Sequence, residues 1–389
     1  MTSHSLIING RFLAQPITGV QRYSIELVKA LDRLLGLDSS NLHSVGFKSS
    51  EDKLPKISIF APSNIYTELH LKHIPIHKVG YLKGHLWEQI ELPFYSRNAA
   101  LLLNLGNTAP FFKQKQIVVI HDASVFAIPQ AYIPLFSAWY QLLYKQLGKV
   151  AKQIITISHF SKAELIKYCQ IDATKIQVAY LGKEHISAQV ADLDFLKQQG
   201  IGNQPFCLAV SSPSKHKNFR AVLEAIALLD HPNQIHEAPK FEVIVVGQAN
   251  PKIFNASAQQ QASAPTNEAT SRVRYLGAVS DRVLKALYQT ASCLIYPSLY
   301  EGFGLPPLEA MTCGCPVITS NAASLPEVCG DAVLYCDPHN SYDIANKIKR
   351  LMQDNTLQEN LRQRGLKQAQ AYNWETCAQT LLTEIAKHS

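Results

Sequence analysis

Residues 296–310 read YPSLYEGFGLPPLEA, and this stretch decides which fold the chain is expected to adopt. The four residues Cys293–Tyr296 that lead into it are apolar and typical of a buried strand. Two glycines follow in a short loop, and Pro306 and Pro307 then mark the first turn of a helix. A strand–loop–helix unit of this kind directs backbone N–H groups and the positive end of the helix toward a ligand. The stretch therefore predicts an anion site in an α/β fold.

Two carboxylates bracket this loop. Glu301 precedes the glycines, and Glu309 is expected in the first turn of the helix. Carboxylate oxygens accept hydrogen bonds from hydroxyl groups, so one could hold a sugar and the other a ribose diol. The alternative is an ordinary loop followed by a helix-capping glutamate, and the spacing alone leaves both open.

The rest of the chain repeats the same alternation of short apolar runs and amphipathic stretches. Continuous apolar runs are typical of strands buried on both faces of a parallel sheet. A polar stretch at 184–204 separates two such series, which predicts two doubly wound, Rossmann-like domains, residues 1–187 and 200–373. The expected strands are 6–9, 57–60, 101–105, 117–120, 154–157 and 176–179 in the first domain, and 206–210, 242–246, 273–276, 293–296, 317–319 and 333–335 in the second.

The amino-acid composition and net charge indicate which kinds of molecule the chain could bind. Of 389 residues, 47% are hydrophobic and 17% charged, which indicates a folded chain, and the formal net charge of +7 fits an anionic partner such as a nucleotide sugar or an anionic lipid surface. No dense run of Lys and Arg indicates nucleic acid. The start has no signal-peptide pattern, and no apolar run approaches the roughly 18 residues that span a bilayer. A cytoplasmic protein with buried free thiols at its eight cysteines is expected.

Further candidates lie in the first half. Gly19 follows the first predicted strand and opens a helix, which is again the pattern of an anion-binding turn. His121 and Ser158 each stand at the carboxyl end of a predicted strand, where open α/β sheets bind ligands. Each also has a structural interpretation: a plain βα turn, a buried structural histidine and a helix cap, respectively.

Together these residues resemble a known family. The Glu-(x)7-Glu pattern around Gly302-Phe303-Gly304, a Gly-x-Pro-Val strand and the segment 324–327 resemble the retaining glycosyltransferases of family GT4, which have the GT-B fold of two Rossmann-like domains facing across a cleft. The resemblance implies that Glu309 binds the donor ribose and Glu301 the donor sugar. It implies that the amides of Phe303, Gly304 and Leu305 serve the sugar and the diphosphate, with Gly302 allowing close approach.

The resemblance also assigns the other half of the site. It implies that the Gly19 loop closes over the diphosphate, that His121 lies at the reaction centre and that Ser158 matches a donor-side position. It implies that the last helix, residues 374–389, returns to the first domain. Segments 87–89 and 104–108 also look family-like and are either acceptor-side or architectural.

The cation that meets the leaving diphosphate is the point at which this chain departs from the family. Lys217 matches the family lysine, and without a metal a cation is needed there. Many relatives carry an Arg five residues before this Lys or immediately before it, where this chain has Ser212 and His216. Lys215 is the candidate substitute. The D-x-D at Asp192–Asp194 stands in the expected linker and is rejected as a metal site, so no metal or other cofactor is expected.

The predicted function is retaining transfer of a hexose from a nucleotide-diphosphate sugar to a glycan or lipid-linked glycan acceptor in bacterial surface polysaccharide synthesis, with mannose favoured on family frequency. The basic stretch Tyr144–Lys152 either contacts the inner membrane peripherally or is a solvated helix face. Two alternatives stay open: a sugar-nucleotide epimerase of GT-B architecture and a non-catalytic nucleotide-sugar-binding subunit. A Rossmann dehydrogenase is not supported, because no G-x-G-x-x-G follows a strand.

Overall fold

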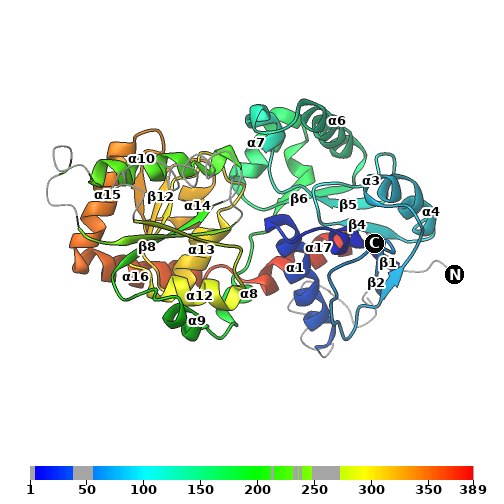
Figure 1. Cartoon of the computed structure of the whole chain (residues 1–389). Coiled ribbons are helices and arrows are strands. Elements are labelled where there is room, and N and C mark those ends of the chain that lie inside the picture. Colours follow the sequence, from blue (N-terminus) through cyan, green and yellow to red (C-terminus); the bar gives the residue numbers. More distant parts are fainter. Residues whose placement is uncertain are drawn as a thin grey trace, which may run out of the picture. The chain divides into compact units, whose positions relative to one another are not determined.

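The computed structural model divides the chain into two compact units (Figure 1). Unit 1 comprises residues 1–182 and 372–389, and unit 2 comprises residues 183–371. The structure describes residues 5–37, 56–211, 214–230, 235, 239–247 and 272–388. Each unit is a doubly wound α/β body, as the alternation of apolar runs and amphipathic stretches predicts.

The described part of unit 1 contains a seven-stranded parallel sheet in the order β3-β2-β1-β4-β5-β6-β7. Its strands are β1 (Ser5–Asn9), β2 (Lys56–Ala61), β3 (Ile76–Lys78), β4 (Leu101–Asn104), β5 (Gln116–Val119), β6 (Gln153–Thr156) and β7 (Ile176–Val178). Its helical segments are η1 (Gly10–Ala14), α1 (Gly19–Leu35), α3 (Gly84–Leu86), η3 (Trp87–Glu91), α4 (Leu92–Tyr95), α5 (Ser124–Ala127), η4 (Pro129–Ala131), α6 (Pro134–Val150), α7 (His159–Cys169), η5 (Ala173–Lys175) and α17 (Trp374–His388).

The described part of unit 2 contains a six-stranded parallel sheet in the order β10-β9-β8-β11-β12-β13. Its strands are β8 (Phe206–Ser211), β9 (Glu242–Gly247), β10 (Val273–Gly277), β11 (Cys293–Tyr296), β12 (Val317–Ser320) and β13 (Leu334–Cys336). Its helical segments are α8 (Glu184–Ser187), α9 (Leu193–Gln198), η6 (Lys215–Lys217), α10 (Phe219–Asp230), α12 (Asp281–Thr290), α13 (Leu305–Thr312), α14 (Leu325–Cys329), α15 (Ser341–Gln353) and α16 (Asn355–Ala369).

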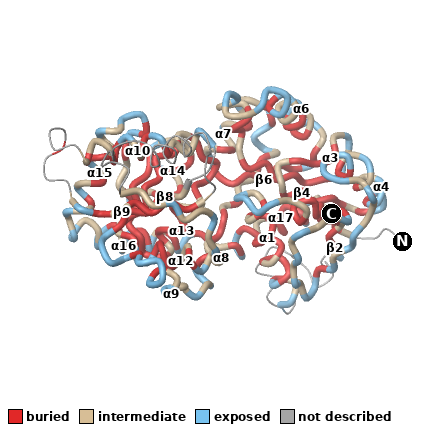
Figure 2. The backbone as a smooth tube through the Cα atoms, in the orientation of Figure 1, coloured by how far each residue is buried: buried red, intermediate tan, exposed pale blue. Residues whose placement is uncertain are grey.

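In both units the strand order reverses between two neighbouring strands, and this topological switch point is where open α/β sheets bind ligands. It falls between β1 and β4 in unit 1 and between β8 and β11 in unit 2. Most residues of the strands are buried (Figure 2), and buried apolar residues form a core cluster in each unit. All eight cysteines are buried and free, which agrees with the expectation from their apolar surroundings.

The last helix belongs to unit 1, where α17 packs beside α1 (Figure 1). Trp374 at its start is fully buried, and its indole lies edge-on to Tyr23 of α1 with 5.8 Å between ring centroids. The backbone of Gly182 approaches the same place so closely that a Cβ there would lie 2.1 Å from the Trp374 nitrogen. This packing ties the two ends of the unit together.

The stretch 184–204, expected as a linker, is instead part of unit 2. It forms α8 and α9, which both pack against α12. Three apolar side chains of this stretch are buried, although most residues around them are polar: Ile186 is 0%, Leu196 3% and Ile201 5% exposed. The sequence does not predict β3, because the side chains of this strand are half-buried or exposed and form no apolar run.

Candidate active site

At the switch point of unit 2, Lys217 and Glu301 form an ion pair. Lys217 ends the short turn after β8, and Glu301 stands in the loop after β11, so adjacent strands deliver the two side chains to one place. Lys217 Nζ lies 2.7 Å from Glu301 Oε1 and 2.9 Å from Oε2. The hydroxyl of Tyr296, the last residue of β11, lies 2.6 Å from Lys217 Nζ and 2.7 Å from Glu301 Oε1.

The two loops are fastened to each other by further hydrogen bonds. Asn218 adopts a left-handed backbone conformation with φ of +54°, and its side-chain amide donates to the carbonyls of Pro297 and Pro338 at 3.1 and 2.7 Å. Ser298 Oγ donates to the His216 carbonyl at 2.9 Å. Because these contacts fix the backbone on both sides, the Lys217–Glu301 geometry is set before any ligand binds.

Burial and neighbouring charges shift the pKa values of Glu301 and Tyr296. Burial alone would raise the pKa of Glu301, but the charge and hydrogen bonds of Lys217, together with a hydrogen bond from Ser298, hold that pKa below its ordinary value of 4.5. Burial, reinforced by the charge of Glu301, raises the pKa of Tyr296 well above 10.0. At neutral pH the cluster is therefore a carboxylate, an ammonium and a neutral phenol.

The glycine loop leads into α13 as the sequence predicts. Gly304 caps the helix with φ of +104°, and a Cβ at this position would lie 2.6 Å from Leu325 Cδ2. Pro306 and Pro307 lack N–H groups, so the amides that can serve a ligand come from residues before them, namely Phe303, Gly304 and Leu305. The Glu301 carbonyl accepts a hydrogen bond from Ser324 Oγ at 2.9 Å, which holds the loop against the start of α14.

The prediction that Glu309 lies in the first turn of α13 was wrong. It lies in the second turn, because the helix begins at Leu305. The side chain of Glu309 is 10% exposed, and its carboxylate already has two partners. His185 Nε2 lies 2.8 Å from Oε1, and the hydroxyl of Tyr288 donates to Oε2 at 3.1 Å. No local pattern points to His185, which is 124 positions away and belongs to α8.

Three other predicted donor residues lie in or next to helical segments: Lys215 in η6, Gly19 in α1 and Ser158 just before α7. Lys215 lies in η6 and is exposed, and Ser212 lies outside the described residues. Gly19 is the first residue of α1, where a Cβ would meet nothing within 4 Å, and Thr18 before it forms a capping box with Gln21. Ser158 caps α7 by accepting a hydrogen bond from the Ser161 amide at 3.0 Å. This is the helix cap that was the structural interpretation of the residue.

His121 lies just after β5 in unit 1 and is 4% exposed. Its Nε2 lies 3.1 Å from the carbonyl oxygen of Leu105, which can only accept, so Nε2 carries the proton and Nδ1 the lone pair. Tyr23 meets the imidazole edge-on at 4.6 Å between centroids. Burial lowers the pKa of His121 from 6.5. The ring is therefore neutral at pH 7, with one acceptor nitrogen.

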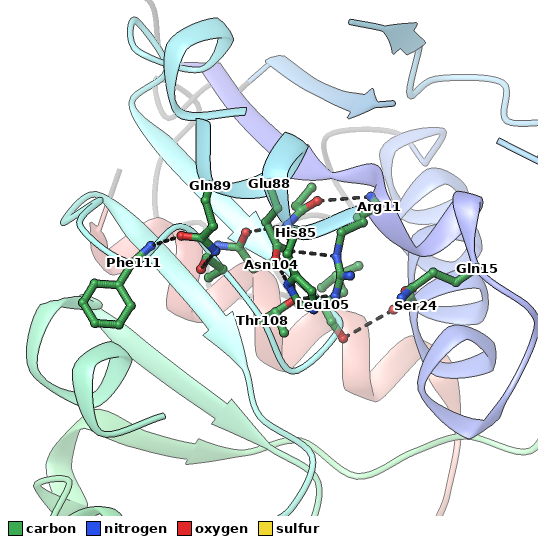
Figure 3. A network of polar contacts seen from close by, with 12 residues as sticks. Arg11, Gln15, Ser24, His85, Glu88, Gln89, Asn104, Leu105, Thr108 and Phe111 are labelled. Atoms are coloured by element: carbon green, nitrogen blue, oxygen red, sulfur yellow. Dashed lines mark hydrogen bonds and ion pairs between the residues drawn. The ribbon is translucent and has the colours of Figure 1, made fainter. Parts of the chain in front are cut away.

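A second buried ion pair occupies the switch point of unit 1 (Figure 3). Arg11 follows β1, and its Nε donates a hydrogen bond to Glu88 Oε1 at 3.1 Å. Segments 87–89 and 104–108, both singled out by sequence, meet here, since Thr108 Oγ1 donates to Glu88 Oε1 at 2.8 Å. Arg11 is not predicted from the sequence; its one signal is its position two residues after the first strand.

The D-x-D motif has local roles. Asp192 caps α9 by accepting from the Phe195 amide at 3.1 Å, and Asp194 lies 3.5 Å from Lys197 on the surface. Among the residues that the structure describes, no group of three or more His, Cys, Asp or Glu side chains is arranged to hold a metal ion.

Comparison with known proteins identifies the family. Residues 193–368 match the model of the glycosyl transferases group 1. The chain is 31% identical over 379 residues to O-antigen chain mannosyltransferase B of Escherichia coli, covering 93% of this chain and 94% of that protein. This protein belongs to the GT4 glycosyltransferases. O-antigen chain mannosyltransferase RfbU of Salmonella typhimurium is 27% identical, with 90% and 91% covered.

The fold agrees with that assignment. Sucrose-phosphate synthase from Thermosynechococcus elongatus superposes with a TM-score of 0.73 over 98% of both chains at 18% identity. This likeness supports the GT-B fold of the glycosyltransferase. The relatives are transferases, which favours sugar transfer over the epimerase and over the non-catalytic subunit. In the described part of the glycosyltransferase, no helix combines the length and the apolar character needed to cross a membrane.

Proposed function

We propose that this glycosyltransferase moves a mannosyl unit from a nucleotide-diphosphate donor to the glycan of a lipid-linked acceptor, with retention of configuration and without a metal ion. The Lys217–Glu301 pair at the switch point of unit 2 carries this proposal, because it places a cation and a sugar-binding carboxylate together. The names of the two relatives, both O-antigen mannosyltransferases, support mannose and a surface polysaccharide.

On the donor side, Lys217 meets the diphosphate and Glu301 accepts hydrogen bonds from hydroxyls of the transferred sugar. All three N–H groups of Lys217 can be directed to the acceptors around it, two on Glu301 and one on Tyr296. Binding of the diphosphate therefore requires Lys217 to exchange at least one of these partners. Glu309 accepts from the ribose diol through the lone pairs that His185 and Tyr288 leave open.

In the transfer step the bond between the anomeric carbon and the diphosphate oxygen breaks, and the acceptor hydroxyl oxygen bonds to that carbon on the same face. The acceptor proton passes to the leaving diphosphate. The charge that develops on the diphosphate is stabilised by Lys217 and by the amides before α13, so no metal ion is needed. His121 offers a neutral ring with one acceptor nitrogen to the reacting sugar.

The donor is tested by calorimetry on the purified protein with GDP-mannose, UDP-glucose and UDP-N-acetylglucosamine, in EDTA and in Mn²⁺. We expect GDP-mannose to bind equally well under both conditions. Glu309→Ala should weaken binding by roughly tenfold, the usual size for a charge-assisted hydrogen bond. Binding only in Mn²⁺ would remove the metal-free mechanism, and preference for another donor would remove mannose.

We further propose that the protein acts at the cytoplasmic face of the inner membrane through α6. The stretch Tyr144–Lys152 needs revision as the contact, because Tyr144 and Leu147 face the core and only its lysines are exposed. Exposed apolar side chains instead stand at the start of the helix, where Ile133 is 75% and Leu135 81% exposed, and Leu142 further along is 55% exposed. An apolar start followed by exposed lysines is the pattern that binds an anionic bilayer.

Flotation with vesicles of phosphatidylglycerol and phosphatidylethanolamine tests this surface. The double variant Ile133→Ser, Leu135→Ser should lose binding. The matched control Val190→Ser, Leu193→Ser, which removes residues 73% and 49% exposed in unit 2, should keep it. Equal binding by both double variants, or none by the unaltered protein, would exclude α6 as the membrane contact.

A further inference from the structure

The hydroxyl of Tyr296 contacts both members of the donor-side ion pair. Tyr296 is the last residue of β11, one of the two strands at the switch point of unit 2, and it is 1% exposed. Thr319 Oγ1 on the neighbouring strand β12 donates to the Tyr296 carbonyl at 2.8 Å, which fixes the backbone at this position. A buried tyrosine hydroxyl needs hydrogen-bond partners, and Lys217 and Glu301 supply them here.

The three residues form a closed triangle of hydrogen bonds. Tyr296 Oη accepts from Lys217 Nζ at 2.6 Å and donates to Glu301 Oε1 at 2.7 Å, and Lys217 Nζ donates to the same Oε1 at 2.7 Å. Burial raises the pKa of Tyr296 well above 10.0, so the phenol keeps its proton at neutral pH and remains a donor to the carboxylate. The contact between Lys217 Nζ and Glu301 Oε2, at 2.9 Å, lies outside the triangle.

The three side chains differ in how far a ligand from solvent can reach them. The side chains of Lys217 and Glu301 are 21% and 10% exposed, whereas Tyr296 is 1% exposed. The phenol therefore forms the inner side of the cluster, and the Lys217 N–H that it accepts points into the protein. A diphosphate from solvent meets the N–H groups on the carboxylate side first. Of the two carboxylate contacts, the one with Oε2 is the longer, and Tyr296 does not brace it.

Exchange of the Oε2 contact is also the least costly exchange. A ligand that took the N–H bonded to Tyr296 would leave the buried phenol oxygen without its donor. A ligand that took the N–H bonded to Oε1 would break the shorter of the two contacts in the ion pair. When the diphosphate takes the N–H bonded to Oε2, the ion pair persists through Oε1, and a sugar hydroxyl supplies a new donor to the released oxygen.

We propose that Tyr296 is a positioning residue that couples binding of the diphosphate to binding of the transferred sugar. Its hydroxyl occupies one N–H of Lys217 and holds Glu301 Oε1, so the diphosphate takes its hydrogen bond from Oε2 and opens that oxygen to a sugar hydroxyl. Tyr296 acts through Lys217 and Glu301 without touching the donor, and its role rests on the donor site proposed above.

Tyr296→Phe removes the hydroxyl and keeps the ring that fills the core. The ammonium of Lys217 can then rotate and offer its third N–H to the diphosphate, while both oxygens of Glu301 stay bonded to it. The sugar hydroxyl therefore finds Oε2 occupied. In calorimetry we expect GDP-mannose to bind roughly threefold to tenfold more weakly, the loss of one hydrogen bond, and the affinity for GDP to change by less than about twofold.

Tyr335→Phe is the matched control. The Tyr335 hydroxyl donates to the Gly330 carbonyl at 2.6 Å, on β13, which is separated from β11 by β12 in the sheet. This variant should leave the affinity for both ligands unchanged.

Three outcomes for Tyr296→Phe would overturn the coupling. An equal loss of affinity for GDP-mannose and GDP would mean that the hydroxyl only supports the fold. Tighter binding of GDP would mean that the phenol is the partner that the diphosphate displaces. No change for either ligand would mean that the hydroxyl has no part in donor binding.

A double-mutant cycle with Glu301→Gln tests whether Tyr296 acts through the carboxylate. Glutamine keeps the size of the side chain but cannot form the ion pair. In the Glu301→Gln background, Tyr296→Phe should change the affinity for GDP-mannose by less than about twofold, because the oxygen that it controls is no longer charged. A loss as large as in the unaltered background would contradict the coupling.

The identity of the donor is tested separately from the role of Tyr296. If UDP-glucose binds and GDP-mannose does not, mannose fails as the transferred sugar, and the same comparison between UDP-glucose and UDP tests Tyr296. If GDP-mannose binds and is transferred while Tyr296→Phe affects both ligands alike, the coupling fails and the proposed function stands.

Discussion

The ammonium of Lys217 lies 2.7 Å from Glu301 Oε1, so the group assigned to the diphosphate and the group assigned to the sugar are bonded to each other before the donor arrives. The pair is largely buried, with the two side chains 21% and 10% exposed. Removal of Lys217 therefore takes away an interaction that lowers the pKa of Glu301, and it weakens donor binding as well.

Replacement of Lys217 by Met should lower the free energy of unfolding at pH 7.5, on the order of 3 kcal/mol, because Glu301 keeps a buried charge without its cation. The folded-state pKa of Glu301 lies below 4.5, so the pair's contribution is complete above about pH 4.5 and is lost as pH falls through the lowered pKa. In the variant, burial raises that pKa instead. Urea unfolding should show the two proteins converging as pH falls below 4.5, whereas a constant difference would contradict the linkage.

His185 should act as a positioning residue for Glu309. His185→Ala removes the 2.8 Å contact to Glu309 Oε1, and the freed carboxylate is expected to weaken GDP-mannose binding roughly tenfold with a smaller change in kcat. His185→Gln, which retains a donor, should recover part of the affinity. Calorimetry checks both variants. A loss of thermal stability without loss of donor affinity would assign His185 a purely structural role.

In the proposed mechanism the His121 ring touches the reacting sugar. His121→Ala should therefore lower kcat on the order of 100-fold and weaken donor binding by a smaller factor. The lowered pKa keeps the ring neutral above pH 6.5, so kcat should show no titration of His121 between pH 6.5 and 8.5. The unfolded chain binds a proton on His121 more readily than the folded chain does. The free energy of unfolding should therefore decrease as pH falls below 6.5. Equal losses of donor affinity in His121→Ala and Glu309→Ala would contradict this division of roles.

Gly304→Ala should destabilise the protein by about 2 kcal/mol, because φ of +104° is strained for alanine and its Cβ would meet Leu325 Cδ2 at 2.6 Å. The double variant Gly304→Ala, Leu325→Ala should cost less than the sum of the single changes, since shortening Leu325 relieves the clash but not the strain. Unfolding midpoints of the three variants measure this coupling. Strict additivity would mean that the loop moves away from α14.

The sequence by itself determined the alternation of strands and helices, because apolar runs and helical spacing are local properties of the chain. It located β1, β11, α13 and the glycine loop with Glu301 to within a residue or two. It did not find β3, whose three residues leave no apolar run, and it took α8 and α9 for a linker because their apolar contacts are few.

Only the tertiary structure decided which polar groups meet. Lys217 and Glu301 are 84 positions apart, Arg11 and Glu88 are 77 apart, and His185 and Glu309 are 124 apart. No local pattern links such residues, since each pair forms where elements distant in sequence pack together. For Lys217 and Glu301 the physical reason is that a parallel sheet collects the carboxyl ends of its strands at one edge, whatever the length of chain between them. For His185 and Glu309 it is the packing of α8 against α13.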